Sequence, residues 1–430
     1  MRTGLVWFRN DLRVADNTSL NTAITNSDRV IACYYLDPRN FETSYFGFKK
    51  TESFRTNFLI ETLIELKKNL QDLNITLLVF EEKPEDVLYS IANSYRVTDI
   101  YLQSEWTSEE LTVSKAVKQS ISEINWHETY NQFLFHPDDI PFDINSIPKV
   151  FTAFRKKCEK YVKVREVSQP QSMPITNLLE DTETISSYTL NQPQKAIKDF
   201  RTAFPFVGGE NQALDRLDYY FWQTQKLSYY KKTRNGLVGK DYSSKFSPWL
   251  ANGSISARTI FHQITKYEQE ITKSQDTYWL IFELIWRDYF KYISLKHENK
   301  IFHLGGILQK NYTWNNDPSL VRKWIDGKTS QPFVNANMLE LKQTGWMSNR
   351  GRQNVASYFA KSLKLDWRIG AAYFESMLID YDVHSNYGNW MYVAGVGNDP
   401  RDRVFNIDVQ AKRYDTDGKF QKQWLQTQLF

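Results

Sequence analysis

The stretch Tyr242–Ser256, which reads YSSKFSPWLANGSIS, gathers hydroxyl groups and an ammonium group directly before a proline. Serine hydroxyls, backbone N–H groups and a lysine side chain can together hold the oxygens of a pyrophosphate. The same residues are also typical of a polar turn that caps a helix, and the stretch alone leaves both interpretations open. The positions in question are Ser243, Ser244, Lys245, Phe246 and Ser247.

The segment FELIWRDYF carries a second group of reactive side chains. Its spacing of i, i+3, i+4 and i+7 places a carboxylate, an indole, a guanidinium and a phenyl ring on one face of a helix. These residues are Glu283, Trp286, Arg287 and Phe290. Such a face can bind a flat polar ligand, but it also fits a surface Glu–Arg pair beside a core tryptophan. The spacing does not decide between the two.

The segment GWMSNRGRQNV predicts a helix with one polar face in an apolar neighbourhood, and that face carries Asn349, Arg352 and Gln353. The later segment DYDVHSNYGNWMY is predicted to be a glycine-containing loop, where the backbone can approach a flat ligand closely. We expect His384 of this loop to be exposed to solvent. The loop offers Asp380, Asp382, Asn386 and Trp390.

The N-terminal elements alternate between strands and helices from residue 4 to about 130. This order predicts a Rossmann-like parallel α/β domain over residues 1–130. The turn after the first strand, FRNDLRVADN, lacks the G-x-G-x-x-G pattern and disfavours an ordinary NAD site. The strands are predicted at Leu5–Phe8, Val30–Leu36, Ile75–Phe80, Asp99–Gln103 and Trp126–Tyr130, with helices at Arg55–Leu73 and Glu85–Tyr95.

Residues 131–195 are rich in Pro, Asp, Ser and Gln and are predicted to be a long linker with one helix at Pro148–Tyr161. Residues 196–430 read as all-helical, so the fold class is α/β + all-α. The strongest predicted helices are Ala213–Tyr230, Ala257–Glu270, Thr277–Lys296 and Arg352–Leu363.

The composition is that of an ordinary soluble protein, with 41% hydrophobic and 24% charged residues among 430. No apolar run approaches the roughly 20 residues of a membrane span, and the N-terminus does not read as a signal peptide. We therefore expect a cytoplasmic protein with no membrane association. Cys33 and Cys158 fit buried thiols, and six histidines without metal-ligand spacing predict no metal site. A net charge of +4 leaves a polyanionic partner open.

These motifs resemble the photolyase/cryptochrome family, and the subfamily that the chain resembles most is cryptochrome DASH. The resemblance rests on YSSKFSPWLANGSIS, FELIWRDYF, GKTSQPFVNANM, WMSNRGRQN and DYDVHSNYGNW, and it runs from VWFRNDLRVADN to GVGNDPRDRVFN. It implies an N-terminal α/β antenna domain, a C-terminal all-helical FAD-binding domain, and blue-light-driven splitting of cyclobutane pyrimidine dimers by electron transfer from excited reduced flavin.

The resemblance also implies roles for single residues around FAD. Asn386 matches the residue that faces flavin N5, where an amide can both donate and accept a hydrogen bond. The chain of Trp390, Trp367 and Trp314 matches the path that carries electrons from the surface to photo-oxidised FAD. The positions that match FAD contacts are Tyr230, Ser243, Ser244, Lys245, Phe246, Ser247, Arg287, Asn349, Arg352, Asp380, Asp382 and Asn386.

The implied substrate face contains Glu283 and Trp286, which suit hydrogen bonding to and stacking on an extruded base. Gln353 and Tyr392 stand where duplex-acting relatives have Met and Trp, and such a polar pocket is less able to open a base pair. We therefore expect a monomer that binds single-stranded DNA with pyrimidine dimers. The paired histidines expected of a six-four photolyase are absent from the WMSNRGRQ region.

The α/β domain of such proteins often holds a second, light-harvesting chromophore, which in the DASH subfamily is usually a folate, 5,10-methenyltetrahydrofolate. Glu109, with Glu105, is the candidate anchor, although acidic residues after a strand also suit a helix's first turn. One alternative function is a non-catalytic blue-light photoreceptor with the same flavin photochemistry. The short stretch after NDPRDRVFN and the presence of Glu283 and Trp286 favour repair. Another alternative, an electron-transfer or adenylating protein, explains only the α/β half.

Overall fold

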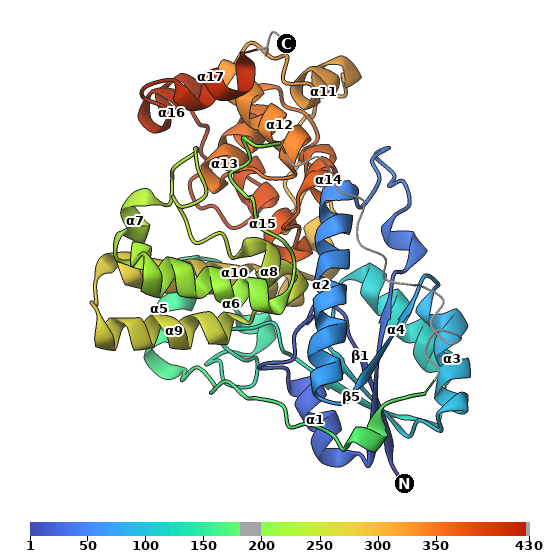
Figure 1. Ribbon diagram of the computed structural model, residues 1–430. Helices are drawn as coiled ribbons and strands as arrows, with labels where there is room; N and C mark the ends of the chain where they lie inside the picture. Colours follow the sequence, from blue (N-terminus) through green and yellow to red (C-terminus); the bar gives the residue numbers. More distant parts are fainter. Residues whose placement is uncertain (122, 181–198, 427–430) are drawn as a thin grey trace.

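The computed structural model describes residues 1–121, 123–180 and 199–426. Its N-terminal part is a five-stranded parallel sheet in the order β3-β2-β1-β4-β5, which lies at the opposite end of the molecule from helices α12, α16 and α17 (Figure 1). The predicted parallel α/β fold is confirmed. The strands are β1 Thr3–Trp7, β2 Arg29–Tyr35, β3 Thr76–Phe80, β4 Asp99–Gln103 and β5 Asn125–Thr129.

Helices cover both faces of this sheet because successive strand side chains point to opposite sides. Val6 of β1 packs with apolar residues of α1 and α2, whereas Leu5 and Trp7 pack with those of α3 and α4. In such a doubly wound sheet, ligands bind at the carboxyl ends of the strands, where the strand order reverses. Here that point lies between β1 and β4. The helices are α1 Thr18–Asn26, α2 Ser53–Asp72, α3 Pro84–Ser94 and α4 Ser108–Ser120.

The C-terminal part is helical, as predicted, and is built around α10, Gln275–His297. A capping box of Ser274 and Thr277 starts this helix, and most of its middle is buried. The other helices are α5 Phe151–Tyr161, α6 Glu210–Asp218, α7 Tyr230–Thr233, α8 Ser247–Asn252, α9 Ala257–Glu270, α11 Pro318–Ile325, α12 Pro332–Thr344, α13 Asn349–Ser357, α14 Trp367–Met377, α15 Val383–Ala394, α16 Ile407–Tyr414 and α17 Lys419–Leu425.

The single helix predicted at Ala213–Tyr230 is wrong. Helix α6 ends at Asp218, a π-helical turn follows over Tyr219–Gln223, and a 3₁₀ turn precedes α7. Gln225 has φ of 49°, in the left-handed region that a right-handed helix cannot contain. The apolar periodicity of the sequence therefore continues although the backbone does not form one continuous α-helix.

The loop predicted around DYDVHSNYGNW is also wrong, because residues 383–394 form helix α15. Asp382 caps this helix by accepting a hydrogen bond from the Ser385 amide at 2.8 Å. A Cβ at Gly388 would come within 2.3 Å of the Phe290 ring, so the glycine permits close contact between α15 and α10.

The described part of the predicted linker packs on both halves of the protein. The Phe151 ring of α5 stacks on Trp286 of α10 with centroids 3.7 Å apart, and the Met173 amide donates to the Leu73 carbonyl at 3.0 Å. Residues 181–195 of this linker lie outside the described residues, and the domain limits at 130 and 195 stay predictions. Among the residues that the structure describes, no helix is long and apolar enough to cross a membrane.

Candidate functional site

A cavity of about 670 Å³ opens between α10, α13, α15 and the segment that follows α15, a volume suited to a small-molecule ligand. It brings together the four residues that the sequence assigned to the substrate face, which come from three different helices. Those four residues are Glu283, Trp286, Gln353 and Tyr392. Two of the predicted FAD contacts, Arg287 and Asn349, also line it.

Glu283 pairs with Arg234 at the wall of this cavity, with 2.5 Å between Nη2 and the carboxylate oxygen. Burial raises the pKa of Glu283, while the charge of Arg234 opposes that rise. The Glu283 side chain keeps 27% of its surface exposed. It can therefore accept or donate a hydrogen bond to a ligand in the cavity.

Trp286 and Tyr392 supply the aromatic surfaces of the cavity. The Trp286 indole is held on one side by the Phe151 ring and meets the Tyr392 ring edge-on, with centroids 5.9 Å apart. It is half-buried and contributes to the cavity wall. An indole in this setting can stack on a flat aromatic ligand.

Arginines fix the polar residues of the same wall. Arg350 donates to the Gln353 side-chain oxygen at 2.8 Å, and Arg403 donates to the Tyr392 hydroxyl at 3.2 Å. Sequence reasoning missed Arg234, Arg350 and Arg403, because a basic residue without its neighbours reads only as surface charge. Their presence gives the cavity a cationic wall.

Helix α15 and its N-cap carry two predicted FAD contacts and one predicted electron-transfer tryptophan at intervals of four, which places them along one side. These residues are Asp382 at the N-cap, Asn386 and Trp390. The Asn386 amide nitrogen donates to the Ala371 carbonyl at 3.0 Å, which fixes its orientation. Lys291 pairs with Asp382 at 2.8 Å. Burial, the largest single effect, would raise the pKa of Asp382, but the charges of Lys291, His384 and Arg287 and the hydrogen bond from Lys291 together hold the pKa well below its usual range.

The serine-rich stretch and the Arg352–Asp380 pair meet at the Trp346 ring. Lys245 Nζ lies 4.6 Å and the Arg352 guanidinium 5.6 Å from that ring's centroid. Arg352 donates to both carboxylate oxygens of Asp380 at 2.9 Å. The backbone at Lys245 has φ of 67°, a conformation that folds the stretch tightly before α8.

Buried polar atoms without hydrogen-bond partners lie within this stretch and next to it. Lys245 Nζ and both carboxylate oxygens of Glu340 are buried and make no hydrogen bond within the described part of the chain. Burial lowers the pKa of Lys245 and raises that of Glu340 to about 8. A buried ammonium without a hydrogen-bond partner beside several serines fits a phosphate-bearing cofactor. Glu340 was missed by sequence reasoning because only its burial singles it out.

Not all predicted cofactor residues border the 670 Å³ cavity. Asn386 and the stretch Ser243–Ser247 lie outside its lining. Tyr230 connects the two regions through hydrogen bonds with Arg234 and Ser244. Burial and the charge of Glu283 raise the pKa of Tyr230, and these two hydrogen bonds oppose the rise. Arg287, which lines the cavity, donates to two backbone carbonyls, of Gln132 at 2.5 Å and Leu250 at 3.0 Å.

Two of the three predicted electron-transfer tryptophans are buried and the third is not. Trp390 and Trp367 are buried, with 2% and 0% exposed, whereas Trp314 is half-buried. The Trp390 ring lies directly over Gly370, one helical turn after Trp367, at a spot that a Cβ would fill. The backbone next to Trp314 is bonded to the chain that precedes α14, where the Asn315 amide donates to Lys364 at 2.6 Å. The electron-transfer role of these three tryptophans stays a prediction.

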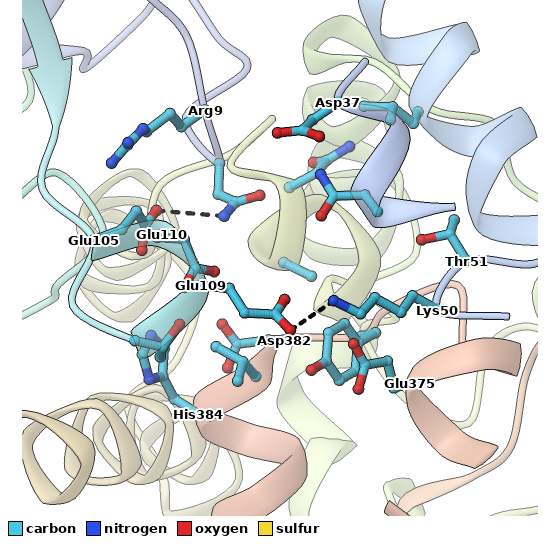
Figure 2. A pocket seen from close by; sticks show the side chains of 18 of the residues that line it. Arg9, Asp37, Lys50, Thr51, Glu105, Glu109, Glu110, Glu375, Asp382 and His384 are labelled. Carbon is cyan, nitrogen blue, oxygen red and sulfur yellow. Dashed lines mark hydrogen bonds and ion pairs between the residues drawn. The ribbon is translucent and has the colours of Figure 1, made fainter. Parts of the chain in front are cut away.

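A second cavity, of about 550 Å³, lies at the carboxyl ends of β1, β2 and β4, against the helical part. Figure 2 shows Glu105, Glu109 and Glu110 of the α/β part facing Asp382 and His384 of α15. The sequence-predicted pair Glu105 and Glu109 is therefore brought together at the point where the strand order reverses.

The three carboxylates have different surroundings. Glu109 is 65% exposed and pairs with Lys50 at 2.6 Å, so it lies at the rim. Glu105 accepts from Gln103 at 2.8 Å. Glu110 has a buried oxygen without a hydrogen-bond partner among the described residues, and burial together with the charge of Glu105 raises its pKa to about 7. Arg9 contributes a similarly unpartnered Nη1. Sequence reasoning missed both Glu110 and Arg9.

His384 was predicted to be exposed, and this is wrong. It is 2% exposed, stacks on Trp106 with centroids 4.5 Å apart, and bonds Ser294 Oγ through Nδ1 at 2.7 Å. Burial lowers the pKa of His384 well below its usual value. The error follows from the wrong loop prediction, because helix α15 turns this side chain inward.

Comparisons with known proteins match both halves of the chain. Residues 4–174 match the family described as DNA photolyase, and residues 279–428 match the FAD binding domain of DNA photolyase. A cryptochrome DASH of Xenopus laevis is 47% identical, covering 97% of this chain and 81% of that protein. A cryptochrome DASH of Gloeobacter violaceus is 45% identical, covering 99% and 85%.

Solved structures agree with these matches. The crystal structure of a Synechocystis cryptochrome has a TM-score of 0.94 and 44% identity, covering 99% of this chain and 89% of that one. An archaeal photolyase from Sulfolobus tokodaii, solved with two FAD molecules, has a TM-score of 0.81 and 28% identity, covering 99% and 90%. The archaeal structure is described as implying a novel light-harvesting cofactor.

Proposed function

The chain belongs to the photolyase/cryptochrome family, in its cryptochrome DASH group, and from this we propose that it uses FAD and blue light to split cyclobutane pyrimidine dimers, preferentially in single-stranded DNA. The observation that carries this proposal is the meeting of Glu283, Trp286, Gln353 and Tyr392 in one cavity. A hydrogen-bonding carboxyl and an indole suit a base turned out of the strand, and the surrounding arginines suit its phosphates.

The chain's own residues position the substrate and hold the cofactor. When bound in its reduced form, FAD would supply an electron to the dimer after light excitation and take it back once the dimer has split, so that the reaction is redox-neutral overall. Trp286 stacks on the extruded pyrimidines, and Glu283, kept in place by Arg234, hydrogen-bonds their polar edge. The serine-rich stretch with Lys245 would hold the diphosphate, and Asn386 would face the flavin ring with its amide fixed by Ala371. Trp390, Trp367 and Trp314 carry electrons inward. We also propose that the protein acts as a monomer.

We expect repair of a dimer in single-stranded DNA to exceed repair in a linear duplex by at least about tenfold, or roughly 1.4 kcal/mol. Extruding a dimer from a duplex costs a few kcal/mol more, and polar Gln353 and Tyr392 offset less of that cost than an apolar wall would. The measurement is initial repair rate under blue light at matched salt, with enzyme whose flavin is fully reduced.

The double variant Gln353→Met with Tyr392→Trp should narrow this gap between the two DNA forms. Loss of the bonds from Arg350 and Arg403 accompanies the change, so each single variant serves as a control. Equal wild-type rates on both forms would overturn the proposed strand preference. Absence of repair on either form, with reduced FAD bound, would favour the photoreceptor function.

We further propose that the 550 Å³ cavity holds a folate antenna, 5,10-methenyltetrahydrofolate. Glu110 and Glu105 would accept hydrogen bonds from the pterin ring, Arg9 would donate to it, and Glu109 with Lys50 would lie at the rim. The unpartnered oxygen of Glu110 and the unpartnered Nη1 of Arg9 support this placement. About one folate and one FAD should be released per chain on denaturation.

Folate affinity should fall as the pH drops below about 7. The pKa of Glu110 is raised to about 7, so the carboxyl is protonated below that pH and ionised above it. Because the ionised form accepts from the ring N–H groups with both oxygens and more strongly than the protonated form, the affinity should fall by at most about tenfold per pH unit. Folate fluorescence titrations between about pH 5.5 and 8 measure this.

The variant Glu110→Gln should bind folate more weakly at pH 8 and lose the pH dependence, with FAD content unchanged. Glu128→Gln, a neighbouring carboxyl that pairs with Lys118 and does not line the cavity, is the matched control. An affinity that is flat or rises on acidification in the wild-type protein would contradict the role of Glu110.

A further inference from the structure

An aromatic shelf lies beside the 670 Å³ cavity on the first turns of α10. We define the shelf as Tyr278, Trp279 and Phe282, which line a shallow surface hollow together with Arg155 of α5 and its ion-pair partner Glu159, 2.8 Å away. Trp279 and Phe282 also line the larger cavity. The shelf and the cavity that we assign to the lesion are therefore one continuous surface.

Two of the three rings of the shelf are stacked on each other, and the third lies next to them. Trp279 and Phe282 are stacked with centroids 4.6 Å apart and an interplanar angle of 28°, and Phe282 is buttressed by the edge of Phe151 at 5.2 Å. Tyr278 lies next to Phe282, 6.4 Å away. Both Tyr278 and Trp279 are half-buried. A half-buried aromatic stack at the protein surface offers area on which another flat ring can be placed.

Cations accompany these rings. Lys231 Nζ of α7 lies 4.3 Å from the Trp279 centroid, and the Arg155 guanidinium lies 5.5 Å from the Phe282 centroid. Arg155 also donates to the Tyr278 hydroxyl at 2.5 Å. On the opposite side of the cavity Arg350 and Arg413 continue the positive charge. Rings interleaved with lysine and arginine are the combination by which proteins bind unpaired nucleic acid.

We propose that the shelf stacks an unpaired base of single-stranded DNA directly adjacent to the lesion, with Lys231 and Arg155 at its phosphates. This inference rests on the proposed function, since it takes the neighbouring cavity as the lesion pocket. A base in a duplex is already stacked on its neighbours and paired, so the shelf gains contact only with a strand whose bases are free. Stacking on the shelf thus adds favourable binding free energy for single-stranded DNA. This contribution is separate from the cost of opening a duplex.

The test uses the full-length protein with FAD bound and measures binding in the dark by fluorescence anisotropy. The probes are oligothymidylates with one dimer and about five further nucleotides on only the 5′ side or only the 3′ side. Trp279→Ala should weaken binding of one of these two probes by about tenfold and change the other much less, because the shelf lies on one side of the cavity. Trp279→Phe, which keeps a ring, should restore most of the affinity.

Trp222→Ala is the matched control, because Trp222 is also half-buried with a lysine over its ring, Lys266 at 5.3 Å, but lines neither cavity. It should bind both probes like the wild type. Equal losses on both probes, no loss with Trp279→Ala, or a similar loss with Trp222→Ala would overturn the proposal.

A wild-type protein that repairs no dimer would instead overturn the proposed function. The shelf is judged separately by dark binding of undamaged oligothymidylate. If repair fails but Trp279→Ala still lowers that binding about tenfold relative to Trp222→Ala, the shelf remains a single-strand surface. If that affinity is unchanged, DNA is not its occupant.

Discussion

Trp390→Phe should reduce blue-light photoreduction of oxidised FAD to below about a tenth of the wild-type rate, while repair by chemically reduced enzyme stays within about twofold. An indole loses an electron far more readily than a phenyl ring, so the change removes an electron donor. It should disturb the fold little. Trp390 Nε1 makes no hydrogen bond with the residues that the structure describes, and Phe359 and Phe374 pack against the ring edge-on.

The control for this prediction is Trp324→Phe, which in addition removes the hydrogen bond from Trp324 Nε1 to the Val355 carbonyl at 3.2 Å. Trp324 is equally buried and lies 6.2 Å from the Trp390 ring, but it is outside the proposed path. It should keep most of the photoreduction rate when FAD bleaching under blue light is followed with an external reductant. A larger loss of photoreduction rate in Trp324→Phe than in Trp390→Phe would show that the electron path runs through Trp324. An equal loss of repair and photoreduction in Trp390→Phe would contradict the proposal that Trp390 serves photoreduction and not repair.

Glu283→Ala should slow dimer splitting or weaken lesion binding by roughly 1–3 kcal/mol, a factor of about 5 to 150. The change removes the carboxyl that faces the cavity and also leaves Arg234, with only 16% of its side chain exposed, without its ion-pair partner. Bound FAD should stay near one per chain. Repair rates at saturating and at limiting DNA separate the effect on splitting from the effect on binding.

Glu283→Gln distinguishes the hydrogen bond from the charge, because the amide keeps an acceptor oxygen and loses the ion pair. We expect its repair rate to fall between those of wild type and Glu283→Ala. Asp326→Ala, which breaks the partly exposed pair with Lys342, controls for a general loss of stability. Wild-type repair by Glu283→Ala would show that the dimer binds elsewhere.

The sheet could be predicted from the sequence because its signal is local. Runs of apolar residues bounded by turns mark each strand, and Asp99–Gln103 has the same limits in sequence and structure. Helix α9 was likewise predicted with its observed limits. The errors occur where tertiary contacts override local patterns. Gly388 suggested a loop, but it is a contact point between helices.

Some residues of the candidate site could likewise be predicted from local patterns, whereas others depend on tertiary contacts. The residue types within each motif identified Glu283 and Trp286, and the family resemblance assigned their roles. The sequence could not show which of Glu109 and Glu110 turns inward, because the two residues are adjacent in the first turn of α4. Lys50, far away in the sequence, pairs with Glu109 at the rim, while Glu110 has a buried oxygen. Unpartnered atoms such as those of Glu340 exist only after the chain has folded.

Helices α10 and α15 each border both cavities. Lys291 and Asp382 face the cavity at the sheet, whereas Phe290 and Ser385 face the other, and the two helices touch at Gly388 without room for a methyl group. A folate in the cavity at the sheet and an FAD held by Arg287 of α10 and Asn386 of α15 would keep a fixed separation and a fixed angle between their transition dipoles, because a close-packed helix pair is nearly incompressible. The efficiency of excitation transfer would then be set by the geometry of two helices and would be independent of solvent viscosity.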